Sequence, residues 1–73
     1  MAAQGYETNR QSIPGTRYRP DAINVQTGEI RELKPDTPSG RAAGRAQLER
    51  YREAAETAFK KTFKVVLDLY RVL

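Results

Sequence analysis

The first alternation of apolar and polar positions along the chain predicts a β-hairpin. Residues 22–31 hold two short β-rich runs on either side of the turn signal Thr27-Gly28. A glycine between two such runs is typical of a tight connection between antiparallel strands. Asp21 and Glu32, which are distant in the sequence, would therefore become cross-strand neighbours.

The register of this hairpin decides which side chains share a face of the sheet. A loop of two or four residues centred between Thr27 and Gly28 pairs Val25 with Ile30, Ile23 with Glu32, and Asp21 with Lys34. All six side chains then share one face, and Asp21 lies diagonal to Glu32. A three-residue loop would pair Asp21 with Leu33 and move Asp21 to the opposite face, because side chains alternate with a period of two.

The next pattern is helical. From about residue 41 to residue 60 the chain consists mainly of strong helix formers, and residues 36–40 supply turn residues and candidate N-caps before it. The apolar positions recur every three or four residues and predict a buried stripe of Leu48, Tyr51, Ala55, Ala58 and Phe59. Small residues near the start, including Gly44, would let the first turns pack closely against a sheet.

Residues 63–73 are β-branched, aromatic and apolar, which predicts a strand buried on much of both faces. The preceding helix permits a right-handed crossover, which makes this strand parallel to the second strand of the hairpin. The order strand, strand, helix, strand predicts an α/β domain with a small mixed sheet. Residues 1–16 have few apolar positions and several turn residues, so we expect an irregular N-terminal arm there and the folded core in residues 17–73.

The composition limits the kinds of catalytic and metal-binding site that the chain can form. The 73 residues include no cysteine and no histidine, which excludes disulfides, thiolate zinc sites and imidazole catalysis. Hydrolysis would then depend on a divalent cation held by carboxylates. The 13 Lys and Arg against 9 Asp and Glu give a formal charge of +4, which favours an anionic partner such as nucleic acid. No apolar run approaches the roughly 20 residues that span a bilayer, so we expect a soluble chain with no membrane partner.

Four features together resemble the PD-(D/E)XK superfamily of restriction-endonuclease-like nucleases. Pro20-Asp21 is followed by Glu32-Leu33-Lys34 on the expected partner strand, and Gln47 and Tyr51 on the helix match the Gln-x-x-x-Tyr motif of the RecB-like branch. The order of elements is the fourth feature. The stretch from Arg17 to Pro35 also resembles the C-terminal nuclease domains of bacterial polymorphic toxins.

The resemblance implies a metal-dependent nuclease that hydrolyses DNA phosphodiester bonds. Asp21 and Glu32 would bind Mg²⁺, or Mn²⁺ in its place, together with the backbone carbonyl of Leu33, since hard cations take oxygen ligands. The ion would polarise the scissile phosphate and lower the pKa of a bound water. Lys34 would orient or deprotonate that water. Gln47 and Tyr51 would contact the lysine, the metal waters or a phosphate.

Partners follow from the same resemblance. The arginines expected to bind phosphates are Arg17, Arg19, Arg41 and Arg45. A toxin domain implies secretion or delivery into a target bacterial cell, action on DNA in its cytoplasm, and a cognate immunity protein. The last strand lacks an obvious cover on one side, which predicts a homodimer or a covering partner chain.

The resemblance is incomplete at the N-terminus. The superfamily fold usually opens with a helix that contributes another acidic residue, whereas here only the arm with Tyr6, Glu7 and Arg10 precedes the hairpin. We therefore expect the first helix to be short or missing. Three explanations are open: that helix was left out of this chain, Glu7 takes its place, or the protein is a minimal member.

Plainer interpretations compete with a nuclease. Asp21, Glu32 and Lys34 could form an ordinary cross-strand ladder of charges, and Gln47 and Tyr51 could be a polar flank and a core aromatic. The alternative function is a non-catalytic nucleic-acid-binding or assembly module with the same fold. A purely structural interaction domain would neither bind nor cut. Metal-dependent cleavage separates the enzyme from both.

Overall fold

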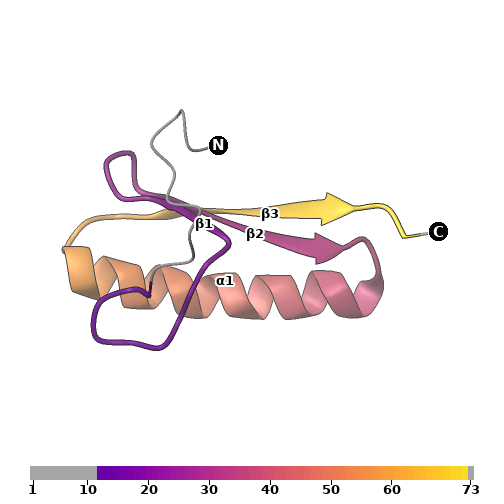
Figure 1. Cartoon of the computed structure of the whole chain (residues 1–73), viewed down its shortest axis with the longest axis horizontal. Coiled ribbons are helices and arrows are strands. Elements are labelled where there is room, and N and C mark those ends of the chain that lie inside the picture. Colours follow the sequence, from indigo (N-terminus) through magenta and orange to yellow (C-terminus); the bar gives the residue numbers. More distant parts are fainter. Residues whose placement is uncertain (1–11, 73) are drawn as a thin grey trace.

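The computed structural model describes residues 12–72, which form a three-stranded sheet packed against one helix (Figure 1). The elements are β1 (Ala22–Asn24), β2 (Glu29–Pro35), α1 (Pro38–Phe59) and β3 (Lys64–Tyr70). β2 lies between β1 and β3, antiparallel to the first and parallel to the second. The predicted α/β architecture, its element order and its mixed sheet are confirmed. Among the described residues no helix is long and apolar enough to cross a membrane.

The β1–β2 hairpin closes one residue earlier than expected. The observed partners are Ala22 with Arg31, Ile23 with Ile30, and Asn24 with Glu29, so the loop comprises the four residues 25–28. The predicted even loop length is correct. The predicted centre between Thr27 and Gly28 is wrong, and so are its three pairs: Val25 with Ile30, Ile23 with Glu32, and Asp21 with Lys34.

Asn24 is the physical reason for this register. Its side-chain Oδ1 accepts a hydrogen bond from the Thr27 N–H (3.2 Å), and its carbonyl accepts one from the Gly28 N–H (2.8 Å). An asparagine that bonds its own following backbone in this way stabilises a turn. Gly28 completes the loop with a φ of 73°, a conformation that glycine adopts without steric cost.

The hairpin loop is tied to the start of β3. The Lys64 N–H donates to the Gly28 carbonyl at 2.7 Å, and Lys61 Nζ donates to the carbonyls of Val25 (2.7 Å) and Gln26 (3.0 Å). Glu56, near the end of α1, accepts from the Phe63 N–H at 2.9 Å. These bonds hold the helix, the hairpin loop and β3 together at one end of the sheet.

α1 begins three residues before the expected start at residue 41. Thr37 is its N-cap and accepts a hydrogen bond from the Gly40 N–H at 3.0 Å, with Pro38 at the first helical position. Both residue types are favoured at these positions. The helix ends at Phe59, and Lys60 follows in the left-handed conformation. The predicted stripe is confirmed, with three members buried and two partly buried against the core.

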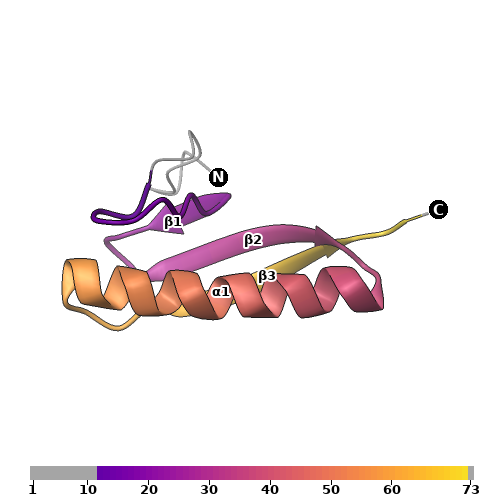
Figure 2. The ribbon, with the colours of Figure 1, turned by 90° about the horizontal axis from the view of Figure 1, so that it is seen from below.

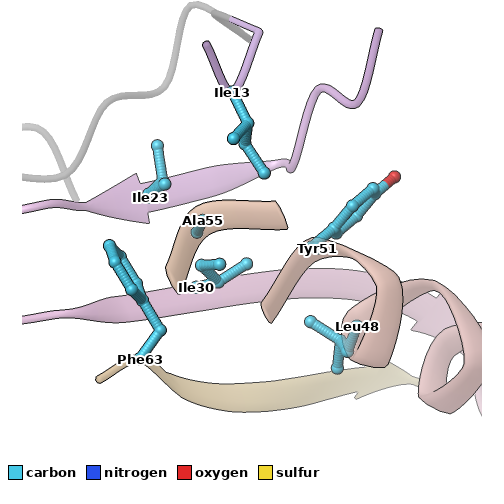
Figure 3. Packing of buried hydrophobic residues seen from close by; sticks show 7 residues of the cluster. All are labelled: Ile13, Ile23, Ile30, Leu48, Tyr51, Ala55 and Phe63. Atoms are coloured by element: carbon cyan, nitrogen blue, oxygen red, sulfur yellow. The ribbon is translucent and has the colours of Figure 1, made fainter. Parts of the chain in front are cut away.

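The core lies between α1 and the β1–β2 hairpin (Figure 3). Its buried apolar residues are Ile13, Ile23, Ile30, Leu48, Tyr51, Ala55 and Phe63. Ile13 lies in the segment that the sequence predicts to be an irregular arm, yet it is only 2% exposed. Its backbone bonds explain the position, because its N–H donates to the Tyr18 carbonyl and its carbonyl accepts from the Thr16 N–H. Tyr6, Glu7 and Arg10 lie outside the described residues.

β3 is parallel to β2, as predicted, but its burial differs from the prediction. Val65 and Leu67 pack against the core, whereas Leu69 is 41% and Tyr70 48% exposed. The expectation of burial on much of both faces is therefore wrong. α1 runs along β2 and β3 (Figure 2), and within residues 12–72 β3 has a strand partner on one edge only. A homodimer or a covering chain stays a prediction.

Two glycines with positive φ provide a matched test of the hairpin connection. Gly28→Ala should lower the free energy of unfolding more than Gly15→Ala, although their φ angles are 73° and 80°. A Cβ at Gly28 would lie 2.6 Å from the Thr62 carbonyl oxygen, whereas one at Gly15 would meet nothing within 4 Å. We expect a loss of about 1 kcal/mol at Gly15 from backbone strain alone. Urea unfolding measures the free energy of unfolding of both variants. Equal losses in the two would show that the contact at Gly28 is unimportant.

Candidate active site

The observed register places Asp21 opposite Glu32. Ala22 pairs with Arg31, so the next position outward on each strand brings these two residues face to face. The Asp21 N–H donates to Glu32 Oε1 (3.1 Å), and Asp21 Oδ2 accepts from the Leu33 N–H (2.8 Å). Each carboxylate is thus bonded to the backbone of the other strand. Asp21 and Glu32 share a face as expected, but they are directly opposite rather than diagonal.

Glu32 is the most enclosed charge of this group. It is 4% exposed, and Lys34 Nζ lies 3.7 Å from its Oε2. Lys34 is two residues further along β2, so the two side chains project from the same face. The ammonium lowers the cost of burying the carboxylate, because an unpaired buried charge is strongly unfavourable.

α1 approaches β2 closely at Lys34. A Cβ at Gly44 would lie 3.0 Å from Lys34 Cγ and 2.5 Å from Leu67 Cδ1. Gly44 therefore lets the helix lie against the lysine side chain. The prediction that small residues permit close packing is confirmed at this position, while Ala42, Ala43 and Ala46 are exposed.

Gln47 and Tyr51 have different environments. Gln47 lies three residues after Gly44, on the same side of α1. Its Oε1 is buried and has no hydrogen-bond partner among the described residues. Tyr51 is 8% exposed and belongs to the core, where its ring packs against Tyr18 with centroids 5.5 Å apart. Figure 3 shows its hydroxyl directed away from the core cluster.

The four candidate phosphate-binding arginines lie on two segments, one that leads to Asp21 and one at the start of α1. Arg17 and Arg19 are exposed on the segment that leads to Asp21, and Arg19 Nε donates to Ser12 Oγ at 3.3 Å. Arg41 and Arg45 are on the early turns of α1, on either side of Gly44 in the chain. Arg41 Nε lies 3.4 Å from Asp36 Oδ1, and Arg45 is exposed.

Two further groups of charged residues form ion pairs among themselves. Arg31 binds Asp68 (2.7 Å) and Glu29 (3.3 Å), and the hydrogen bond that it donates to Asp68 raises the pKa of Arg31. On α1, Arg52 binds Glu49 and Glu56; its hydrogen bond lowers the pKa of Glu49. Within residues 12–72 no cluster of three His, Cys, Asp or Glu could hold a metal ion. An ion at this site would therefore depend on two carboxylates, backbone oxygen and water.

The comparison with protein families gives the context for this arrangement. A family model described as restriction endonuclease fold toxin 9 matches residues 1–70. The chain belongs to this family. No curated protein and no solved structure matches it. The resemblance to restriction-endonuclease-like toxin domains is thereby confirmed, the three-stranded mixed sheet with one helix agrees with that fold, and membership suggests nuclease activity. The RecB-like assignment of Gln47 and Tyr51 stays a prediction.

Sequence reasoning missed two features near this site. The role of Asn24 in closing the hairpin had a signal, since asparagine is a common turn residue whose side chain bonds the backbone that follows it. The packing of Tyr18 on Tyr51 had none, because Tyr18 lies in an irregular segment where spacing predicts no face.

Gly44→Ala tests whether the helix positions Lys34. The new methyl group would press on Lys34 Cγ and Leu67 Cδ1, so we expect nuclease activity to fall about tenfold or more while the protein stays folded. The control is Ala46→Gly at an exposed position, which costs about 1 kcal/mol of helix stability without altering the lysine contact. Cleavage rates and melting temperatures of both variants decide the outcome. Equal losses of activity would assign the effect to stability instead.

Proposed function

We propose that this domain is a Mg²⁺-dependent nuclease that hydrolyses DNA phosphodiester bonds. The observation that carries the proposal is the arrangement of Asp21, Glu32 and Lys34 on one face of the β1–β2 hairpin, linked by the bonds at 3.1 and 2.8 Å and the contact at 3.7 Å. Two carboxylates and an ammonium in one place can hold a cation and orient a water.

The donor set fits a hard divalent cation. Asp21 and Glu32 supply carboxylate oxygens from facing strands. The Leu33 N–H donates to Asp21, and in a strand the carbonyl of the same residue points to the same edge, so the Leu33 carbonyl would be the backbone ligand on the side of Asp21. Mg²⁺ usually keeps several waters and needs few protein ligands, which suits such a set, and Mn²⁺ takes the same ligands. When bound, the ion would polarise the scissile phosphate and acidify a water.

Lys34 and Gln47 would assist the reaction. The Lys34 ammonium lies near Glu32 and would orient the attacking water and offset the negative charge that grows on the phosphate. Gln47 offers a buried acceptor, Oε1, with no hydrogen-bond partner among the described residues. A buried acceptor of this kind normally has a partner, and the Lys34 ammonium or a metal-bound water would supply one. Tyr51 would contribute through its hydroxyl, since its ring is committed to the core.

The family also supports a cellular role. Membership in a toxin family favours a domain that is delivered into a target bacterial cell and degrades DNA in the cytoplasm. A producing cell would then need an immunity protein that blocks the domain. The exposed arginines Arg17, Arg19 and Arg45, together with Arg41, would bind the phosphates of the substrate.

One observation favours the alternative, a nucleic-acid-binding module without cleavage. The described residues supply two carboxylates to the site and no third acidic ligand. Binding through the arginines would not require a metal. The enzyme and the module differ in whether they nick DNA.

A plasmid-nicking assay with Mg²⁺, Mn²⁺ or EDTA tests the proposed reaction. The wild-type chain should nick in either metal and be inactive in EDTA, and Asp21→Asn, Glu32→Gln and Lys34→Met should each lose about a hundredfold or more. The two amide variants keep acceptor oxygens, so circular dichroism should show an intact fold. Glu29→Gln is the matched control, because Glu29 lies on β2 but pairs with Arg31 on the other face. Full activity of Glu32→Gln would contradict the metal site.

A salt titration tests the phosphate contacts. Binding to two unrelated duplexes, measured in Ca²⁺ to limit cleavage, should weaken steeply with salt and be similar for both sequences. Arg41→Ala with Arg45→Ala should flatten the logarithmic slope by about 1.8, which is roughly 0.9 for each lost phosphate contact. Arg52→Ala is the control, because two carboxylates, Glu49 and Glu56, hold Arg52, whereas Arg41 has one carboxylate nearby and Arg45 is exposed. An affinity independent of salt, or a strong preference for one duplex, would refute this account.

A further inference from the structure

A cavity of about 440 Å³ lies beside the second half of α1, outside the group formed by Asp21, Glu32 and Lys34. It is a groove open to solvent between the helix and the irregular segment that precedes β1. The described residues that line it are Pro14, Gly15, Thr16, Tyr18, Arg50, Glu53, Ala54, Thr57 and Ala58. A volume of this size falls within the range of small-molecule sites.

The lining combines an apolar wall with polar groups. Pro14, Ala54 and Ala58 contribute apolar surface, and Tyr18 adds an aromatic ring that is 36% exposed. The tilted packing of Tyr18 on Tyr51 holds this ring in place, with 58° between the ring planes. The cavity therefore presents a fixed aromatic ring that a second flat ring can contact.

Arg50 and Glu53 bring an unpaired donor and acceptor to the cavity. Neither makes an ion pair or a hydrogen bond among residues 12–72, although residues three apart on a helix are neighbours. The contrast with Arg52 is direct, because Arg52 binds Glu49 and Glu56 on the same helix. A ligand that needs both a donor and an acceptor would use these two free side chains.

We propose that this cavity binds an unpaired nucleobase of the nucleic-acid substrate, in contact with Tyr18 and with its edge toward Arg50 and Glu53. The inference rests on the proposed function, since it assumes that nucleic acid is the substrate. A nucleobase is flat and carries hydrogen-bond donors and acceptors on its edge, which matches an aromatic wall with an arginine and a glutamate. A base within a duplex is stacked on its neighbours, so only an unstacked base can enter.

The position of the cavity suits a nucleotide close to the cleaved bond. Gln47, in the proposed site, and Ala54, in the cavity wall, are on the same helix and are about 10 Å apart along its axis at 1.5 Å per residue. Arg17, exposed beside Tyr18, would bind a phosphate of the same strand. The substrate would then be single-stranded or locally unpaired around the site.

The test compares a single-stranded oligonucleotide with an abasic strand of equal length, by fluorescence anisotropy in Ca²⁺. Wild-type protein should prefer the strand with bases by about fivefold to a hundredfold, the range expected for one stacked base. Tyr18→Ala should remove this preference without weakening abasic binding, and Tyr18→Phe should retain it. Tyr70→Ala is the matched control, because Tyr70 is exposed on β3 and does not line the cavity.

A second variant controls for the packing on Tyr51 that Tyr18→Ala also removes. Thr57 is exposed and lines the cavity, so Thr57→Leu fills space there without removing a core contact. It should abolish the preference for bases as Tyr18→Ala does. The same comparison made with RNA strands distinguishes a base of DNA from a base of RNA as the occupant of the cavity.

The outcomes separate this inference from the proposed function. Equal wild-type affinity for both strands, or an unchanged preference in Thr57→Leu, would overturn the nucleobase site while plasmid nicking still supports the nuclease. If the wild-type protein binds neither strand and does not nick a plasmid, the proposed function itself is wrong.

Discussion

The hydrogen bonds of Asn24 to the backbone of its own loop determine the geometry on which the proposed site depends. They close the hairpin after four residues and so set the register of β1 against β2. Side chains alternate between faces, so a loop one residue shorter or longer would move Asp21 away from Glu32. The contacts of Gly28 and Lys61 with the start of β3 then hold the loop in this form.

The site arises where the hairpin meets the first half of α1. Gly44 lets the helix lie against Lys34, and the lysine in turn lies beside the buried carboxylate of Glu32. Burial of that carboxylate is tolerated because it accepts a backbone hydrogen bond and has an ammonium nearby. The other half of α1 bears the ion pairs of Arg52 and the cavity beside Tyr18, so the chemistry and the proposed base contact occupy different parts of one helix.

Much of the fold could be predicted because it depends on local patterns. Helix formers and the spacing of Leu48, Tyr51 and Ala55 predicted α1 and its buried stripe, and a helix between two strands predicted that β3 is parallel to β2. The candidate site was predictable where it depends only on the alternation of strand side chains between the two faces of the sheet. Any hairpin loop with an even number of residues places Asp21 on the same face of the sheet as Glu32, whichever residues of the two strands are paired.

The sequence alone therefore determined the element order, the helical stripe and the shared face of the two carboxylates, since these follow from periodicities within a few residues. Only the tertiary structure decided the pairing of Asp21 directly opposite Glu32, the burial of Ile13 in the core and the exposure of Leu69. The buried acceptor of Gln47, which has no hydrogen-bond partner within residues 12–72, also emerged only there. Each of these depends on contacts between segments that are distant in sequence. A local pattern of residues does not predict the energies of such contacts.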